Sequence, residues 1–307
     1  MPELPEVHTT VTGLKKAIQG LLFKDIWSDM WSNSPLAKNT IKSKAYFPYF
    51  SKKALKSKVL DVRRRAKYIL IDLENDFSII IHMKMTGHLI YGEYVKNEAY
   101  NGKEWSWKPT QNNTKGLFDP YNRHIHVVFS LSNGKHLVFC DSRKFGTITV
   151  EETSTLETKK FAHLGPEPLT PSFTIKKLTD RLLLSPKRSI KTVLMDQSIL
   201  SGIGNIYSDE ILYTSNILPQ RTPLSLTKKE IEHIHVSMKK LLKKGIDFGG
   251  DSMSDYRNIH GERGHFQEKH QVYLRTTLPC VRKNCKGTIT KQKINGRSAH
   301  YCNVCQK

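Results

Sequence analysis

The sequence has no long hydrophobic run and no recognisable leader. No stretch approaches the about 18 consecutive apolar residues that a membrane-spanning helix needs, so no membrane span is expected. The N-terminus lacks a basic segment followed by an apolar one, so no secretory signal is expected. We therefore expect an intracellular protein in a reducing compartment. Whether that is a nucleus, a nucleoid or a viral replication site stays open.

Cysteine is scarce over most of the chain. Only five of the 307 residues are cysteine, and four of these lie between residues 280 and 305. The fifth, Cys140, stands alone in a strand-like run. A disulfide framework would distribute its cysteines through a small secreted domain, whereas a local cluster is typical of a metal site.

Acidic residues are outnumbered by basic ones. The chain carries 49 Lys and Arg against 28 Asp and Glu, a formal net charge of +21. Such a charge implies a polyanionic partner. Nucleic acid is favoured over an anionic membrane, because the basic residues are spread along the chain instead of gathering in one amphipathic helix or tail. The ordered aromatic residues of an RNA-binding sheet are not found.

The length suits about two domains of roughly 100 to 200 residues with a small appendage. Apolar residues recur at helical spacing from Val7 to Ile18, with Pro5 in the expected first turn and Gly20 after the last one. The pattern predicts a helix that begins within a few residues of the N-terminus.

Short β-rich runs follow between about Leu21 and Glu152. Seven such runs, separated by turns, predict a β-sandwich or open barrel. The Asn133-Gly134 pair between two of them predicts a type I′ hairpin. Residues 97–119 have little periodicity and many Asn, Gly and Lys, so we expect an inserted surface loop there.

Helical spacing dominates after residue 173. Residues 153–173, with three prolines near their end, predict an interdomain linker. A long helix is predicted from Leu226 to Lys244, with Thr227 and Glu230 in capping-box spacing and Gly245 at its end. Shorter helices are predicted in residues 174–184, 189–196 and 205–213.

The clustered cysteines have the spacing C-x4-C-x16-C-x2-C. Two close pairs of thiolates are what a tetrahedral Zn²⁺ site requires, and four thiolates leave no position for water, so we expect one structural zinc ion. Four reduced cysteines without a metal are the alternative. Asn295-Gly296 between the pairs predicts a hairpin with Arg297 at its tip, away from the metal. The expected ligands are Cys280, Cys285, Cys302 and Cys305.

The extreme N-terminus offers a candidate nucleophile. Removal of Met1 would leave Pro2 as a secondary amine, and an α-amino group titrates well below lysine, so a neutral fraction exists at neutral pH. Such an amine can attack an electrophilic carbon and form an iminium. The helix dipole disfavours the protonated amine, whereas Glu3 and Glu6 favour it. The sequence alone does not show which effect on the pKa of the amine is larger. An ordinary helix entry is the alternative interpretation.

Three motifs occur together and in order: MPELPEV at the start, ILSGIGNIYSDEIL, and the terminal four-cysteine finger. Together they resemble the formamidopyrimidine-DNA glycosylase and endonuclease VIII family of base-excision repair enzymes. The resemblance covers nearly the whole chain, with insertions mainly around residues 97–119.

The resemblance implies an α+β multidomain fold and a DNA substrate. The expected parts are an N-terminal β-sandwich with a leading helix (1–152), a linker (153–173), a helical helix-two-turn-helix domain (174–270) and a four-cysteine zinc-finger hairpin (271–307). The implied partner is double-stranded DNA with oxidised bases or abasic sites, with single-stranded DNA as a further candidate. We expect a monomer.

The resemblance also implies catalytic roles. Pro2 would attack C1′ of the damaged nucleoside, Glu3 would serve as acid and base, and Glu6 would be a supporting carboxylate. The base must first be flipped out of the duplex. The resulting iminium acidifies the sugar, so that β- and then δ-elimination cut the strand. Glycosylase and AP lyase activities are therefore expected together.

Six further residues match functional positions of the family. Lys67 is expected to be catalytic together with Pro2 and Glu3, and the other five are expected to bind DNA. Lys67 in VRRRAKYILI matches a hairpin lysine beside the lesion phosphate, Asn205 a phosphate-binding residue, and Arg297 the finger arginine. Without the resemblance, Lys67 and Arg297 would be interpreted as solvated surface charges.

The flipped base leaves a void that must be filled. The resemblance implies that Met85, Arg143 and Phe145 fill it. Without the resemblance, Met85 and Phe145 read as core residues of strands.

Some positions depart from the family pattern. Lys84 replaces the glycine of the family's HLGM segment, and residues 249–266 form a polar stretch where the family carries a variable damaged-base loop. These departures favour oxidised pyrimidines and hydantoin or ring-opened lesions. The alternatives are 8-oxoguanine and formamidopyrimidine-type purine specificity, or a non-catalytic zinc-finger DNA-binding protein.

Overall fold

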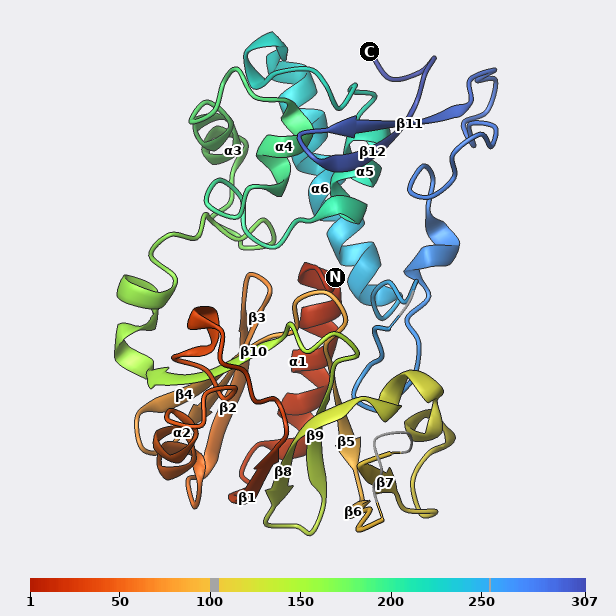
Figure 1. Cartoon of the computed structure of the whole chain (residues 1–307). Coiled ribbons are helices and arrows are strands. Elements are labelled where there is room, and N and C mark those ends of the chain that lie inside the picture. The colour runs from red at the N-terminus through yellow and green to blue at the C-terminus, as the bar shows by residue number, and fades with distance from the viewer. Residues whose placement is uncertain (100–104, 254) are drawn as a thin grey trace. The chain divides into compact units, whose positions relative to one another are not determined.

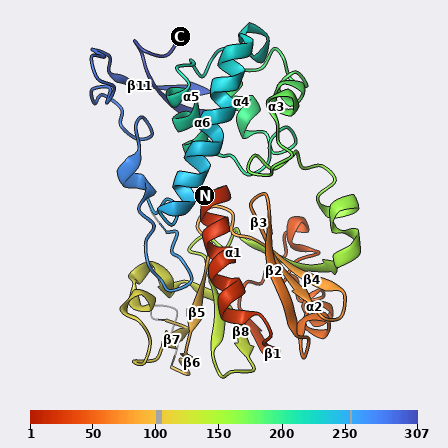
Figure 2. The same ribbon diagram turned by 180° about the vertical axis from the view of Figure 1, so that it is seen from behind.

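The computed structural model describes residues 1–99, 105–253 and 255–307. The chain forms two compact units. The N-terminal unit comprises Met1–Ala162 together with Gly249–His265, and the C-terminal unit comprises His163–Phe248 together with Phe266–Lys307 (Figures 1 and 2). The expected linker, residues 153–173, is thus divided between the units. Among the described residues, no helix combines the length and apolar character needed to cross a membrane.

The N-terminal unit is built on two four-stranded antiparallel sheets. The first sheet contains, in spatial order, β1 (Phe23–Ser28), β8 (Ile125–Leu131), β9 (His136–Cys140) and β5 (His88–Gly92). The second contains, in spatial order, β10 (Thr147–Glu152), β4 (Phe77–His82), β3 (Tyr68–Leu73) and β2 (Val59–Arg65). The predicted β-sandwich is therefore confirmed.

All seven β-rich runs of the sequence form strands, whereas the strand β1 and the helix α2 were not predicted. The edge strand β1 escapes the pattern because its exposed residues Lys24 and Asp25 are adjacent at an irregular pairing with β8. The short helix α2 (Phe47–Ala54) escapes because four of its eight residues are Pro, Tyr or Phe, which are weak helix formers.

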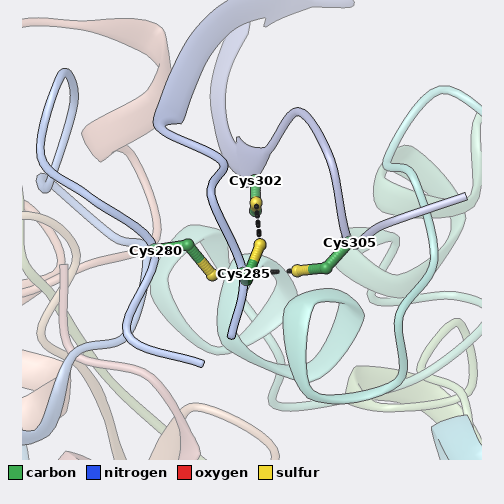
Figure 3. A group of neighbouring side chains, drawn as sticks. All are labelled: Cys280, Cys285, Cys302 and Cys305. Carbon is green, nitrogen blue, oxygen red and sulfur yellow. Dashed lines mark hydrogen bonds between the residues drawn. The ribbon is translucent and has the colours of Figure 1, made fainter. Parts of the chain in front are cut away.

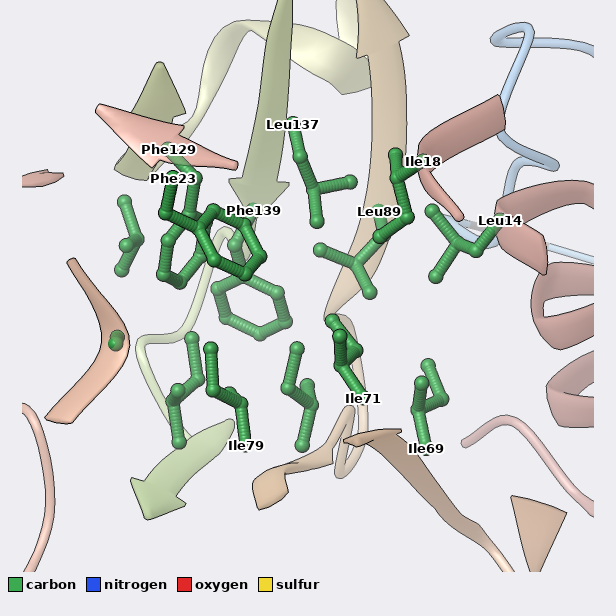
Figure 4. Packing of buried hydrophobic residues seen from close by; sticks show 14 of the residues in the cluster. Leu14, Ile18, Phe23, Ile69, Ile71, Ile79, Leu89, Phe129, Leu137 and Phe139 are labelled. Carbon is green, nitrogen blue, oxygen red and sulfur yellow. The ribbon is translucent and has the colours of Figure 1, made fainter. Parts of the chain in front are cut away.

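The core lies between the two sheets. Inward-facing isoleucines of β3 and β4, among them Ile69, Ile71 and Ile79, meet aromatic residues of β8 and β9 such as Phe129 and Phe139 (Figure 4). All five side chains are fully buried, and burial of each contributes about 1.5 to 3 kcal/mol. Period-two alternation along each strand thus produces one continuous hydrophobic layer.

Helix α1 (Leu4–Ile18) closes one side of this sandwich. It contacts β2 of one sheet and β5 of the other (Figure 2), and its buried face includes Leu14 and Ile18. Glu3 and Glu6 form a capping box at its start, and Pro5 lies in its first turn, where no intrahelical N–H bond is lost. Gly20 follows with a φ of 85°, as the sequence predicted for the end of the helix.

The turn between β8 and β9 differs from the predicted type I′ form. Gly134 has a φ of 81°, but Asn133 is not in the left-handed region. The amide of Gly134 donates to the carbonyl of Leu131, and the amide of Leu131 donates to Lys135. These bonds define a three-residue loop with a left-handed glycine. Asn-Gly fits both turns, so the strand register decided between them.

The insertion at residues 97–119 has more regular structure than expected. β6 (Tyr94–Lys96) pairs with β7 (Trp107–Pro109), and two 3₁₀ turns follow at Lys115–Phe118 and Pro120–Arg123. The part of the predicted loop at residues 100–104 lies outside the described residues.

The C-terminal unit is helical with one hairpin. Its elements are α3 (Ile175–Leu182), α4 (Ile190–Met195), α5 (Asn205–Thr214), α6 (Lys228–Asp247), β11 (Ile289–Ile294) and β12 (Arg297–Cys302). The predicted hairpin is confirmed, because Asn295 and Gly296, with φ of 45° and 79°, join Ile294 directly to Arg297.

Helix α6 begins as predicted but does not end at Gly245. Thr227 and Glu230 form the expected capping box, yet the helix continues to Asp247. Gly245 is instead a packing position, because a Cβ there would collide with the ring and hydroxyl of the buried Tyr207 on α5. Close helix packing, which a single sequence does not reveal, explains this glycine.

Gly245→Ala should therefore destabilise the protein although alanine is the better helix former. The clash should cost about 1 to 3 kcal/mol, which exceeds the gain in helix propensity of about 1 kcal/mol. Val236→Ala, at an exposed position of the same helix, is the control and should be neutral or slightly stabilising. Urea denaturation measures both, and a Gly245→Ala protein as stable as wild type would contradict this account.

Candidate functional site

The first turn of α1 brings together the three residues singled out at the N-terminus. Pro2, Glu3 and Glu6 are all buried. The backbone amide of Glu3 donates to Oε2 of Glu6 at 2.7 Å. The carboxylate of Glu6 therefore satisfies one of the amides that a helix start leaves without an intrahelical acceptor.

The second oxygen of Glu6 binds a distant part of the chain. Oε1 accepts from the backbone amide of Asp251 at 2.7 Å. Gly250, with a φ of 88°, packs so closely on the Glu6 side chain that a Cβ would meet it at 2.9 Å. Burial, followed by the charge of Glu3, raises the pKa of Glu6 to about 7. A buried carboxyl group that titrates near neutrality thus lies beside the candidate nucleophile.

Lys67 lies in the tight turn between β2 and β3. Ala66 before it has a φ of 53°, and its carbonyl accepts from Arg64 at 2.9 Å. Lys67 is only 4% exposed, so the alternative of a solvated strand-end lysine does not apply. Burial, then Lys84, then Lys67 lower the pKa of His82 to about 3, which indicates that His82 is neutral beside these cations.

Three other predicted residues lie on two loops of the N-terminal unit, and they are exposed. Met85 is 39% exposed and Phe145 is 48% exposed, so neither is a core residue. Arg143 is also exposed, and its guanidinium stacks on the Phe145 ring at 4.3 Å from the centroid. Apolar side chains that are exposed to solvent are available for contact with another molecule.

Asp141, which the sequence analysis missed, organises both loops. Its buried carboxylate accepts from the amides of Gly146 at 2.7 Å and Arg143 at 3.2 Å, and from the hydroxyl of Thr86. The loop of Arg143 and Phe145 is thereby tied to the loop of Met85. An aspartate directly after a strand and before polar turn residues was the available signal, because such residues bond nearby backbone amides.

The departure at Lys84 has a structural meaning. Lys84 has a φ of 55°, in the left-handed region that glycine adopts without cost. This conformation explains why a glycine suits the position. The backbone amide of Lys84 donates to Nδ1 of His82 at 2.9 Å, which holds the strained turn.

In the C-terminal unit, Asn205 is the first residue of α5. The loop before it is ordered by Gln197, whose Oε1 accepts from Gly202 at 2.9 Å and whose Nε2 donates to Ile203 at 2.7 Å. Gly202 has a φ of 94°. Oδ1 of Asn205 is buried and has no hydrogen-bond partner among the described residues. An anion would be bound here by donors, because a helix start presents backbone N–H groups and the Asn205 side chain also carries an NH2 group.

Arg297 lies at the tip of the β11–β12 hairpin and borders a pocket of about 210 Å³. The hairpin is tied to α4, since Asn295 donates to Thr192 at 3.1 Å. Arg188, just before α4, and Lys191 of α4 share the pocket, and Lys191 also reaches the carbonyl of Asn205 at 3.4 Å. The predicted finger arginine is thus part of a basic pocket.

The four cysteines converge as a single cluster (Figure 3). Their sulfur atoms all lie within 4.8 Å of one another. The Sγ atoms of Cys280 and Cys305 are 3.8 Å apart, and those of Cys285 and Cys302 are 3.7 Å apart. A tetrahedral ion with sulfur ligands at about 2.3 Å requires sulfur separations of about 3.8 Å. The donor set therefore fits Zn²⁺.

Two buried carboxylates of α5 hold this region in place, and the sequence analysis assigned neither. Asp209 accepts from the amide and Nδ1 of His300, both at 2.9 Å, and pairs with the buried Lys191 at 2.5 Å. Glu210 accepts from three consecutive amides of residues 271–273 at 2.9 to 3.0 Å. Loss of one partner of such a buried pair costs about 3 to 5 kcal/mol.

Comparison with known proteins agrees with this arrangement. The profile of the formamidopyrimidine-DNA glycosylase N-terminal domain matches residues 1–148, and that of the formamidopyrimidine-DNA glycosylase H2TH domain matches residues 164–257. The chain belongs to the formamidopyrimidine-DNA glycosylase family. It is thus a DNA glycosylase, and the expected fold of sheet domain, helix-two-turn-helix domain and four-cysteine cluster is confirmed.

Relatives and solved structures of the family match over the full length. Formamidopyrimidine-DNA glycosylase of Rickettsia felis is 36% identical over 306 residues, covering 100% of this chain and 98% of the relative. That of Pelotomaculum thermopropionicum is 36% identical over 310 residues, covering 100% and 99%. The Lactococcus lactis enzyme in complex with abasic-site DNA is 28% identical, with a TM-score of 0.81 and 99% of both chains covered.

Glu6 should make stability depend on pH. Its folded pKa of about 7 lies above the ordinary value, so the folded state holds the proton more tightly, and this stabilisation is lost as the pH rises through about 7. The melting temperature of the wild type should therefore fall between about pH 5 and 8 by the equivalent of up to about 3 kcal/mol.

Glu6→Gln is the variant that tests this assignment. Glutamine cannot titrate, so its melting temperature, although lower overall, should change much less across the same pH range. Calorimetry at a series of pH values measures both proteins. An equally steep fall in Glu6→Gln would assign the pH dependence to another group.

Proposed function

We propose that the protein is a bifunctional DNA glycosylase and AP lyase that removes formamidopyrimidine-type and 8-oxoguanine-type purine lesions. The observation that carries the proposal is the buried cluster of Pro2, Glu3 and Glu6 at the start of α1. In this cluster a potential secondary amine precedes two buried carboxyl groups, and burial raises the pKa of Glu6 to about 7; such an arrangement suits nucleophilic and acid–base catalysis.

In the proposed reaction, removal of Met1 exposes the nitrogen of Pro2, whose lone pair attacks C1′ of a flipped nucleotide. The C1′–N bond breaks, and the base leaves with the bonding electron pair and takes up a proton. The nitrogen releases its proton, the C1′–O4′ bond breaks as O4′ takes up a proton, and the sugar ring opens to an iminium. This iminium acidifies C2′, so loss of a proton there expels the 3′ phosphate by β-elimination, and δ-elimination then expels the 5′ phosphate.

The two carboxyl groups divide the proton transfers. Glu3 serves as the acid and base at the sugar. Glu6 is buried behind it, and its raised pKa reflects a group kept largely uncharged at slightly acid pH. Its hydrogen bonds to Glu3 and Asp251 hold the helix start in a fixed geometry, which is what alignment of a nucleophile requires.

The remaining site residues are proposed to hold DNA. Lys67 contacts the phosphate at the lesion, and Asn205 and Arg297 bind the same backbone through the helix start and the basic pocket. Positive charge of +21 supports such contacts. The exposed Met85 and the stacked Arg143–Phe145 pair fill the space left by the flipped base.

The lesion class is proposed from the relatives. The full-length relatives are named formamidopyrimidine-DNA glycosylases, and a Lactococcus lactis structure contains Fapy-dG DNA. These names favour the purine alternative over the oxidised pyrimidines that the sequence analysis preferred. The replacement of glycine by Lys84 was one reason to prefer oxidised pyrimidines. The conformation of Lys84 weakens that reason, because this lysine keeps the left-handed turn that a glycine would form.

We also propose that the four cysteines bind one structural Zn²⁺. The ion would fix the base of the β11–β12 hairpin, on whose tip Arg297 lies. Elemental analysis should give about one zinc per chain. Cys285→Ser should release the metal and lower DNA affinity, and a metal-free wild-type protein with full DNA affinity would refute the zinc proposal.

A non-catalytic DNA-binding protein is the remaining rival. Borohydride reduction in the presence of abasic-site DNA separates the two functions, because it converts an iminium into a permanent covalent link. The wild type should be trapped and should cleave the strand, while Pro2→Gly and Glu3→Gln should lose most cleavage.

Lys108→Ala, an exposed lysine of β7, is the control and should retain full activity. Duplexes with Fapy-dG, 8-oxoguanine or an oxidised pyrimidine then rank the lesions. DNA binding without any trapped adduct would support the rival, and a preference for the pyrimidine duplex would overturn the proposed lesion class.

A further inference from the structure

Residues 249–253 and 255–265, called the strap here, lie along one face of α1. Asp251 donates its amide to Glu6, and Tyr256, which is buried, donates its hydroxyl to the carbonyl of Glu6 at 3.0 Å. The Tyr256 hydroxyl also lies 3.4 Å from that of Thr10.

The third contact lies one turn further along the helix. Ile259 packs on Gly13, where a Cβ would come within 2.9 Å of the isoleucine. The spacing from Glu6 through Thr10 to Gly13 is i, i+4, i+7, which is one face of a helix. The strap therefore follows α1 from its first turn onward.

The other side of the strap is held by a partly buried ion pair. Arg257 is 2% exposed. Its Nε donates to Oδ2 of Asp119 at 3.0 Å and its Nη2 to Oδ1 at 3.3 Å, which makes the pair bidentate. The guanidinium also stacks on Tyr121, 4.7 Å from the ring centroid, and donates to the carbonyl of Tyr256 at 2.8 Å.

Asp119 belongs to the insertion, and the insertion is fixed to the sandwich. Asn122 is fully buried, and its side chain donates to the carbonyl of Gly116 at 2.9 Å. Its Oδ1 lies 2.9 Å from Nε2 of His88 on β5. Cys140 of β9 donates to its carbonyl at 3.2 Å. Asp119 is thus presented from a rigid support rather than from a loose loop.

The insertion and the strap also touch through their backbones. A Cβ at Gly116 would collide with the carbonyl of His260, and one at Gly261 would collide with Gly116. The hydroxyl of Thr114 donates to the same carbonyl of His260 at 3.4 Å. Two glycines at one contact indicate a close and specific fit.

We propose that Asp119 and Arg257 form a positioning pair that holds the strap against α1 and thereby fixes the first turn of that helix. The pair acts through the strap on Glu6, whose carboxylate in turn holds the amide of Glu3. The inference rests on the proposed function for its kinetic readout alone.

Glu6 provides a second readout, which is independent of activity. The charged and titratable groups that face it are Glu3 at the helix start and Asp251 and Tyr256 on the strap. Burial is the largest cause of its raised pKa. If the strap moves away, water reaches the carboxyl group and its pKa falls.

Arg257→Met and Asp119→Asn remove the ion pair with little change in side-chain size. Single-turnover cleavage of a duplex with one abasic site should become about 10- to 100-fold slower, while the dissociation constant for the duplex stays unchanged. The loss of melting temperature between about pH 5 and 8 should also shrink, because Glu6 no longer titrates near neutrality.

The double variant and a conservative variant sharpen the test. Asp119→Asn with Arg257→Met should be no slower than either single variant, since the two residues act as one unit. Arg257→Lys should recover part of the rate. Glu98→Gln, which removes an exposed ion pair elsewhere in the insertion, should behave as wild type in both measurements.

The proposal is overturned if cleavage stays within about twofold of wild type, or if only DNA affinity falls. It is also overturned if the melting temperature drops equally at every pH, which is the behaviour of a purely structural pair. Asp119→Asn, at a partly exposed position, decides the question if Arg257→Met does not fold. A wild type that cleaves no DNA refutes the proposed function, whereas the pH-dependent melting still tests the pair.

Discussion

The start of helix α1 is the constraint on which the N-terminal unit depends. A helix leaves its first amides without intrahelical acceptors, and a buried helix start must find acceptors elsewhere. Here one carboxylate, that of Glu6, accepts from Glu3 within the helix and from Asp251 on a segment more than 240 residues away in sequence. Local capping and long-range assembly therefore share one side chain, and the candidate nucleophile Pro2 lies directly before it.

The same use of buried acidic residues recurs elsewhere. In a chain with a net charge of +21, carboxylates are scarce, yet several in the described part of the chain are almost fully buried and bind backbone amides, among them Glu6, Asp141, Asp209 and Glu210. Asp141 ties together the loops that carry Met85 and Phe145, and Glu210 holds the segment that leads into the cysteine cluster. The buried carboxylates hold these loops and segments in place. The exposed basic residues can therefore contact DNA without also having to stabilise the fold.

Much of the architecture could be predicted from local patterns. Helical spacing and caps located α1 and the start of α6, short β-rich runs between turns located seven strands, and cysteine spacing located the four-cysteine cluster. The rest depends on partners distant in sequence. The packing role of Gly245 is set by Tyr207, the turn at Asn133 by strand register, and the pairing of Asp119 with Arg257 by a fold that joins residues 138 positions apart. No local pattern carries that information.

The candidate site, too, could be predicted only in part from the sequence. The motifs identified Pro2, Glu3 and Lys67 as residues to examine, but burial of Lys67 and exposure of Met85 and Phe145 appeared only in three dimensions. Asp141, Asp209 and Glu210 were not recognised as residues that hold the site, because an isolated Asp or Glu in a sequence suggests a surface charge.

The central claim is that Pro2 itself bonds to the sugar. Mass spectrometry of the borohydride-reduced adduct, after digestion of protein and DNA, tests it most directly. The account predicts a sugar fragment on the nitrogen of Pro2 in a peptide that lacks Met1. A fragment located on a lysine, or a fully active protein that retains Met1, would contradict it.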